Sequence, residues 1–182
     1  DRQHGGLLEL HRSVIARTSD PRVNLGSYDA WRMIDNVVQF GQAQRVTVLP
    51  IPDREIDDYI DRGMELLAPA IKRVEHNVDL DDVREDILTG TSILWLVYLE
   101  DKLTAAITTC VVKHPQRKNL KIEFMGGKHM HVWMNKAVDV LAGLAKDAKL
   151  DAVEADGRKG FERYVDGSAF RPIYTHYEME LR

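Results

Sequence analysis

Two glycines stand between a predicted strand and a predicted long helix in the stretch FMGGKHMHVWMNKAVDVLAGLAK, residues 124–146. Glycine lets a backbone come close to a bound group, and the first amides of a helix attract anions. Gly126, Gly127, Lys128 and His129 are therefore the candidate residues for holding a phosphorylated cofactor. The alternative is a strand-to-helix turn that needs glycine only for its backbone angles.

Three histidines are the candidate metal ligands: His129 and His131, with His114 as a third. Two histidines at i and i+2 diverge on a helix and converge only on one face of a strand. A zinc site needs further ligands at defined spacing, and none is evident. We therefore expect no metal site. The single cysteine, Cys110, lies in the apolar run AAITTCVV and is expected to be a small buried residue.

The composition is that of a soluble globular protein. The 182 residues are 44% hydrophobic and 30% charged, with a formal net charge of −4. This balance gives no electrostatic signal for nucleic acid or for an anionic membrane surface. No apolar run approaches the ~20 residues of a membrane-spanning helix, and the first residues lack the blocks of a signal peptide. We expect a soluble protein in a reducing compartment.

The chain divides at about residue 44. Residues 1–44 hold two amphipathic helical segments, with the stripes Leu7/Leu10/Val14 and Trp31/Ile34/Val38. They are short for an independent domain, so we predict a helical arm followed by one domain at 45–182.

In that domain the elements should position the glycine turn within a sheet. A short strand near Arg45 precedes two helices, the second capped by Asp79 and ended by Gly90. A hairpin joined at Glu100-Asp101 follows, then a strand, the long helix, the strand LDAVEA, a helical turn at RKGFERYV and a last strand, IYTHYEMEL. An antiparallel start that passes into β-α-β units predicts an α/β mixed sheet flanked by helices. Trp95, Trp133 and Leu141 should be buried in its core.

This order of elements resembles the GNAT superfamily, the acetyl-coenzyme A-dependent N-acyltransferases, over residues 45–182. It is most similar to a divergent branch found among tailed-phage and prophage genes. The stretches that resemble this branch are GTSILWLVYLEDKLTAAITT, the GG and VW that enter the long helix, DGRKGFERYV and FRPIYTHYEMEL.

The resemblance implies a site for the pyrophosphate of acetyl-coenzyme A at an Arg/Gln-x-x-Gly-x-Gly/Ala turn. Aligning the helix end at Ala145 with the family's pattern places the two glycine positions near Val132 and Met134. Side chains of that size would crowd a pyrophosphate, so the cradle is predicted to be degenerate. We therefore expect no cofactor, or acetyl-coenzyme A if the chain is an enzyme.

The resemblance also implies a general base and a general acid. Glu123, on the fourth strand, and Tyr164, near the family's tyrosine position, are the candidates. The alternatives are a solvated strand residue for Glu123 and a core-edge residue for Tyr164.

Two functional hypotheses follow. The first is a virion-associated structural or accessory protein of a tailed bacteriophage, which uses a degenerate GNAT-like fold as a protein-binding module. Its arm would contact other particle proteins or copies of itself. The second is an active N-acetyltransferase, located in the cytoplasm, that acts on an unknown amine.

Overall fold

The computed structural model describes most of the chain from residue 44 onward. The described residues are 44–74, 78–157, 159–161, 164, 170–174 and 179. The predicted helical arm, residues 1–44, lies outside them except for its last residue, and so does most of the predicted last strand. The division at residue 44 therefore stays a prediction.

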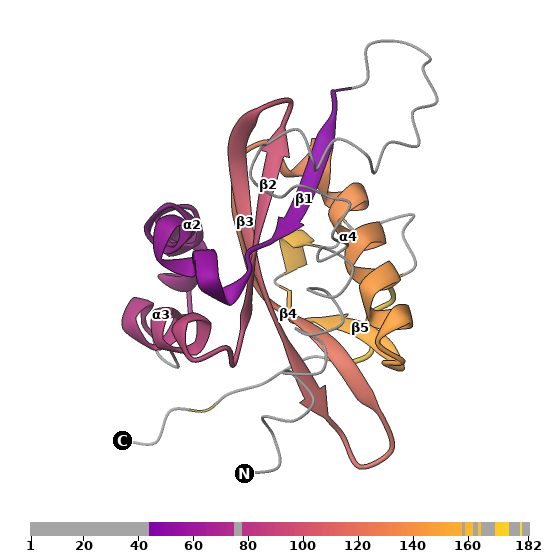
Figure 1. The fold of residues 1–182 in the computed structure, drawn as a ribbon. Helices are drawn as coiled ribbons and strands as arrows, with labels where there is room; N and C mark the ends of the chain where they lie inside the picture. Colours follow the sequence, from indigo (N-terminus) through magenta and orange to yellow (C-terminus); the bar gives the residue numbers. More distant parts are fainter. Residues whose placement is uncertain are drawn as a thin grey trace, which may run out of the picture.

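Five strands form one sheet in the order β1-β2-β3-β4-β5 (Figure 1). The first four strands are antiparallel, and β5 joins β4 in parallel. The predicted α/β mixed sheet is therefore confirmed. The strands are β1 Val46–Pro50, β2 Ile93–Leu99, β3 Lys102–Lys113, β4 Lys118–Gly127 and β5 Ala152–Ala155.

The hairpin of β2 and β3 lies at the middle of the sheet. Nearly all of β2 is buried, as expected for a strand whose sheet is covered on both faces. Glu100 and Asp101 form the link, because Leu99 pairs with Lys102. Glu100 takes a left-handed backbone with φ of 54°. The predicted tight link is confirmed.

Two helices, α2 Ile56–Ile71 and α3 Leu80–Leu88, cover one face of the sheet (Figure 1). Leu67 and Ile71 of α2 belong to one buried cluster with Leu94, Leu96 and Ala106 of the sheet. None of the helices in the described ranges has the length and apolar character needed to cross a membrane.

The ends of α3 follow the predicted capping chemistry. The Asp79 carboxylate accepts hydrogen bonds from the amides of Asp81 and Asp82, at 2.8 and 2.9 Å. The Asp82 side chain accepts from the Asp79 amide in return, which completes a capping box. Gly90 follows the helix with φ of 72°, a conformation that favours glycine.

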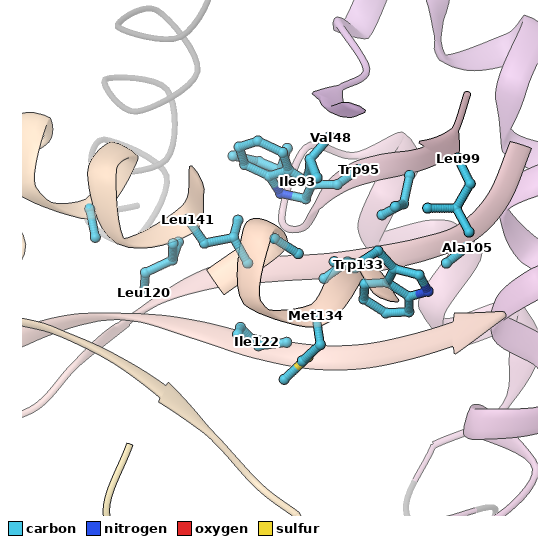
Figure 2. Packing of buried hydrophobic residues seen from close by; sticks show 14 residues of the cluster. Val48, Ile93, Trp95, Leu99, Ala105, Leu120, Ile122, Trp133, Met134 and Leu141 are labelled. Carbon is cyan, nitrogen blue, oxygen red and sulfur yellow. The ribbon is translucent and has the colours of Figure 1, made fainter. Parts of the chain in front are cut away.

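The long helix α4, Met130–Asp147, covers the opposite face of the sheet (Figure 1). Trp133 and Leu141 are both 0% exposed there, and Trp95 of β2 is 2% exposed in the same cluster (Figure 2). The indole N–H groups of both tryptophans have acceptors. Trp95 Nε1 donates to Thr109 Oγ1 at 2.9 Å, and Trp133 Nε1 donates to the Lys128 carbonyl at 2.8 Å. The predicted burial of these three side chains is confirmed.

Truncating Leu141 tests the contribution of this packing. We expect Leu141→Ala to lower the free energy of unfolding by about 2–5 kcal/mol, because it opens a cavity beneath α4. Lys136→Ala is the matched control, since Lys136 is exposed on the same helix. Urea unfolding followed by circular dichroism measures both variants. Equal stability of Leu141→Ala and the parent would contradict the packing of α4 on the sheet.

Candidate functional site

Strands β4 and β5 run together for only part of the length of β4. Their pairing joins Asn119–Ile122 to Ala152–Ala155, whereas β4 continues to Gly127. Over this second half, β4 pairs with β3 on one side, and no described strand pairs with it on the other. Among the described strands, β4 and β5 therefore separate after Ile122.

A bulge in β4 lies at the same point. Thr108 pairs with Phe124 and Thr109 pairs with Ile122, so Glu123 is an extra residue in β4. Ile122 belongs to the cluster beneath α4, whereas Phe124 packs against the cluster beneath α2 and α3. A bulge of this kind re-aims side chains and is common beside active sites. Because Ile122 faces α4, ordinary alternation places Glu123 on the α2/α3 face, and the bulge keeps Phe124 on that same face.

The Glu123 carboxylate contacts two hydrogen-bond donors from neighbouring segments. Ser92 Oγ, just before β2, donates to Glu123 Oε2 at 2.5 Å. The Cys110 side chain of β3 lies on the same face beside this carboxylate, and its interaction with Glu123 helps to stabilise the ionised form. Ser92 and Cys110 face each other because Ile93 and Thr109 are paired. Glu123 is thus half-buried and its carboxylate is fixed by neighbouring side chains. A fully solvated strand residue would have neither property.

The surroundings of Glu123 favour its neutral form. Burial is the main cause that raises the pKa of its carboxyl above the ordinary value, and the charge of Asp86 adds to it. The interactions with Ser92 and Cys110 and the charge of Lys121 act in the opposite direction. Lys121 Nζ is engaged with Asp156 Oδ2 at 2.8 Å. A glutamate with a raised pKa is better suited to take a proton near neutral pH than an ordinary surface glutamate.

Cys110 differs from the buried apolar residue that the sequence predicts. Its side chain is half-buried, and its thiol lies against Glu123. Burial, followed by the charge of Glu123, raises the thiol pKa to about 12. Cys110 therefore stays protonated at neutral pH and acts as a donor, since only the thiolate is a strong nucleophile. Its contact with Glu123 depends on strand register, which the sequence did not reveal.

The two glycines at the end of β4 are explained by close packing within the protein. A Cβ at Gly126 would lie 2.0 Å from the Leu66 carbonyl oxygen of α2. A Cβ at Gly127, where φ is 135°, would lie 2.4 Å from the Thr104 carbonyl oxygen of β3. That carbonyl also accepts a hydrogen bond from the Lys128 amide at 3.1 Å. These glycines therefore face the protein's own backbone.

The start of α4 has the features of an anion site. His129 precedes the helix with a left-handed backbone, φ of 55°, and makes no side-chain cap. The Val132 amide donates to the His129 carbonyl at 2.9 Å, whereas Met130 and His131 supply amides of the kind that a helix start leaves free. Lys128 and His129 are exposed beside them. The positive end of the helix dipole adds to the attraction for an anion.

The two bulky residues of the predicted degenerate cradle do not lie in front of this helix start. Met134 is 2% exposed and belongs to the core cluster beneath α4. Val132 packs against the same cluster. Because α4 begins at Met130, Met134 is turned inward, and the degenerate cradle stays a prediction.

Tyr164 lies away from the Glu123 carboxylate. It is half-buried and packs against the cluster on the α4 side of the sheet, whereas Glu123 points to the face covered by α2 and α3. The structure therefore does not bring together the two residues that the resemblance implies as base and acid.

The candidate metal ligands are divided between two places. The rings of His129 and His131 meet edge to face, with their centroids 6.4 Å apart. His114 Nε2 is 3.0 Å from Glu154 Oε2, near the other end of β4. The described part of the chain contains no group of three or more His, Cys, Asp or Glu residues that could hold a metal ion.

Comparison with solved structures identifies the fold. No protein-family model and no curated protein matches the sequence. A ribosomal-protein-alanine N-acetyltransferase from Brucella melitensis biovar Abortus 2308 matches with a TM-score of 0.55 and 15% identity, over 76% of this chain and 100% of that one. An aminoglycoside acetyltransferase from an uncultured soil metagenomic sample matches with a TM-score of 0.52 and 9% identity, over 75% and 97%. At such low identity these likenesses show the fold alone. They confirm the predicted fold, which is similar to that of acetyltransferases of known structure.

The raised pKa of Glu123 predicts a pH-dependent effect on stability. The folded chain binds this proton more tightly than the unfolded chain, so Glu123 stabilises the fold most below its unfolded pKa, about 4.3. This contribution is lost as pH rises through the folded pKa. We therefore expect Glu123→Gln, measured by thermal unfolding against the parent, to be relatively more stable at pH 7 than at pH 4.

Glu65→Gln is the matched control, because Glu65 is exposed on α2. The pH dependence of Glu123→Gln is read relative to this variant. A Glu123→Gln variant that behaves in the same way as this control would contradict the raised pKa.

Proposed function

We propose that this chain transfers an acyl group from an acyl-coenzyme A to an amine, with Glu123 as the general base. The observation that carries the proposal is the placement of Glu123. It is the extra residue of the β4 bulge, at the point where β4 and β5 separate. Its carboxyl is half-buried and has a raised pKa, chiefly because of burial.

The residues at the start of α4 fit the phosphates of such a cofactor in part. The amides of Met130 and His131 and the side chains of Lys128 and His129 would hold the pyrophosphate. Gly126 and Gly127 would not contribute a cradle, because both face the protein's own backbone. Bound acyl-coenzyme A supplies the activated acyl thioester.

Glu123 would make the acceptor amine nucleophilic. An amine is largely an ammonium ion at neutral pH and attacks a thioester only after losing a proton. The Glu123 carboxylate accepts this proton directly or through one water molecule. The amine nitrogen would then form the amide bond as the thioester C–S bond breaks, and coenzyme A would leave as a thiolate that takes a proton from water. The likeness of the fold to acetyltransferases supports this role, and the matched enzymes are named for acceptors as different as an aminoglycoside and a ribosomal protein alanine. The acceptor here is specified only as an amine.

Acetyl-coenzyme A binding tests the cofactor part of the proposal. We expect saturable binding to the full chain in the micromolar range by titration calorimetry. Lys128→Ala should weaken it about fivefold at low salt, as expected for the loss of about 1 kcal/mol of charge attraction. Lys136→Ala, exposed further along the same helix, should leave it unchanged. Binding no tighter than millimolar would contradict the proposal.

Glu123→Gln tests the base. With acetyl-coenzyme A and an amine that the parent acetylates, kcat/KM should fall by about 10²–10⁴, the usual contribution of a general base. Coenzyme A release, followed with a thiol reagent, measures the rate. An unchanged rate would exclude Glu123 as the base.

A second candidate function is a binding module without catalysis, within a tailed-phage particle. The specific observation that favours it is the packed glycine turn. Gly126 and Gly127 contact α2 and β3, and the Lys128 amide is already bonded to Thr104. The resemblance to a phage-encoded branch adds support. On this view the arm at residues 1–44 binds a neighbouring copy or another particle protein, and mass spectrometry of purified particles would detect the chain.

Deleting residues 1–44 tests the predicted arm. The described clusters on both faces of the sheet are formed by residues from 46 onward, so the remaining domain should stay folded. We expect a nearly unchanged melting temperature and, in light scattering, the loss of any self-association that the full chain shows. Collapse of the domain on deletion would show that the arm and the domain are one folding unit.

A further inference from the structure

Two donors that the resemblance does not assign converge on Glu123. Ser92 Oγ lies 2.5 Å from Glu123 Oε2, and Cys110 lies beside the same carboxylate because it pairs with Lys121 on the neighbouring strand. We infer that Ser92 and Cys110 are positioning residues, which hold the Glu123 carboxylate in place as a proton acceptor. Their part in catalysis rests on the proposed function. Their positioning of the carboxylate does not depend on that function.

The fold fixes Ser92 more firmly than an ordinary turn serine. Ser92 is 3% exposed and sits between the end of α3 and the start of β2. Its amide donates to the Asp86 carbonyl of α3 at 2.9 Å. A hydroxyl anchored in this way can hold a carboxylate in one orientation without a large entropic cost at the time of reaction.

Cys110 complements Ser92 from the neighbouring strand. Its side chain points to the same face as Glu123, because Cys110 pairs with Lys121, two residues before Glu123. The thiol stays protonated across the neutral range, since burial and Glu123 raise its pKa to about 12. It therefore remains a donor wherever Glu123 is an acceptor.

The charged groups around Glu123 stabilise its ionised form less than the two donors do. Asp86 of α3 repels the carboxylate, and Lys121 of β4 attracts it while paired with Asp156. Burial and the charge of Asp86 both disfavour the ionised carboxylate. Removing either donor takes away one of the interactions that offset them. The carboxyl should then require a higher pH to lose its proton.

The experiment follows the Glu123 carboxyl carbon by NMR in the full chain, labelled with ¹³C-glutamate and assigned with Glu123→Gln. We expect Ser92→Ala and Cys110→Ala each to move its titration midpoint upward by about one pH unit, from the strength of one hydrogen bond to a charged group. Cys110→Ser restores a donor and should return the midpoint toward the parent value. Thr91→Ala, which removes the adjacent exposed hydroxyl, should leave it unchanged.

The acetyl-transfer assay gives the second readout. The acidic limb of the pH profile of kcat/KM should move upward in the same variants and return with Cys110→Ser. Unmoved midpoints in both alanine variants, with folding verified by circular dichroism, would overturn the inference. If the midpoints move but the chain transfers no acyl group, Ser92 and Cys110 do position the carboxylate and the proposed function is wrong. If Ser92→Ala does not fold, the comparison of Cys110→Ala with Cys110→Ser tests the inference by itself.

Discussion

The one-residue bulge at Glu123 sets the geometry on both faces of the sheet. Side chains of a regular strand alternate between faces, so residue 124 would normally share the face of Ile122. The bulge instead places Ile122 beneath α4 and Phe124 beneath α2. Met125 then returns to the α4 side, and Gly126 meets the Leu66 backbone of α2. A regular register would move all later residues of β4 to the wrong face.

Glu123, the extra residue of this bulge, places a carboxylate in a largely apolar sheet. A buried charge is costly unless hydrogen bonds satisfy it. Ser92, just before β2, donates one such bond, and Cys110 of β3 lies beside the same carboxylate. Lys121, whose charge favours the ionised form of Glu123, is engaged with Asp156. Glu123 is thus supported by neutral donors more than by an ion pair, which leaves it able to exchange a proton without breaking a salt bridge.

Local chemistry made much of the fold predictable, and register made the site hard to predict. A buried strand could be predicted from the apolar run of β2, a helix start from Asp79, and a buried helix face from the periodicity around Trp133. The contacts of Glu123 depend on which residues of β3 and β4 face each other, and a bulge cannot be read from alternation in one strand. For this reason the sequence assigns Ser92 no role at the site and predicts Cys110 as a small buried residue.

The start of α4 shows a different limit of sequence reasoning. Counting back from the helix end placed the phosphate turn at Val132 and Met134, but α4 begins at Met130. The connection from β4 is then only Lys128 and His129, with the Lys128 amide already used by β3. Few backbone donors remain for a phosphate, so charge must provide more of the attraction than in a full glycine cradle. Attraction between exposed charges weakens as salt shortens the Debye length to about 8 Å at physiological ionic strength. A cofactor held at this helix start would therefore be bound less tightly, and with a stronger dependence on salt, than one enclosed by backbone amides.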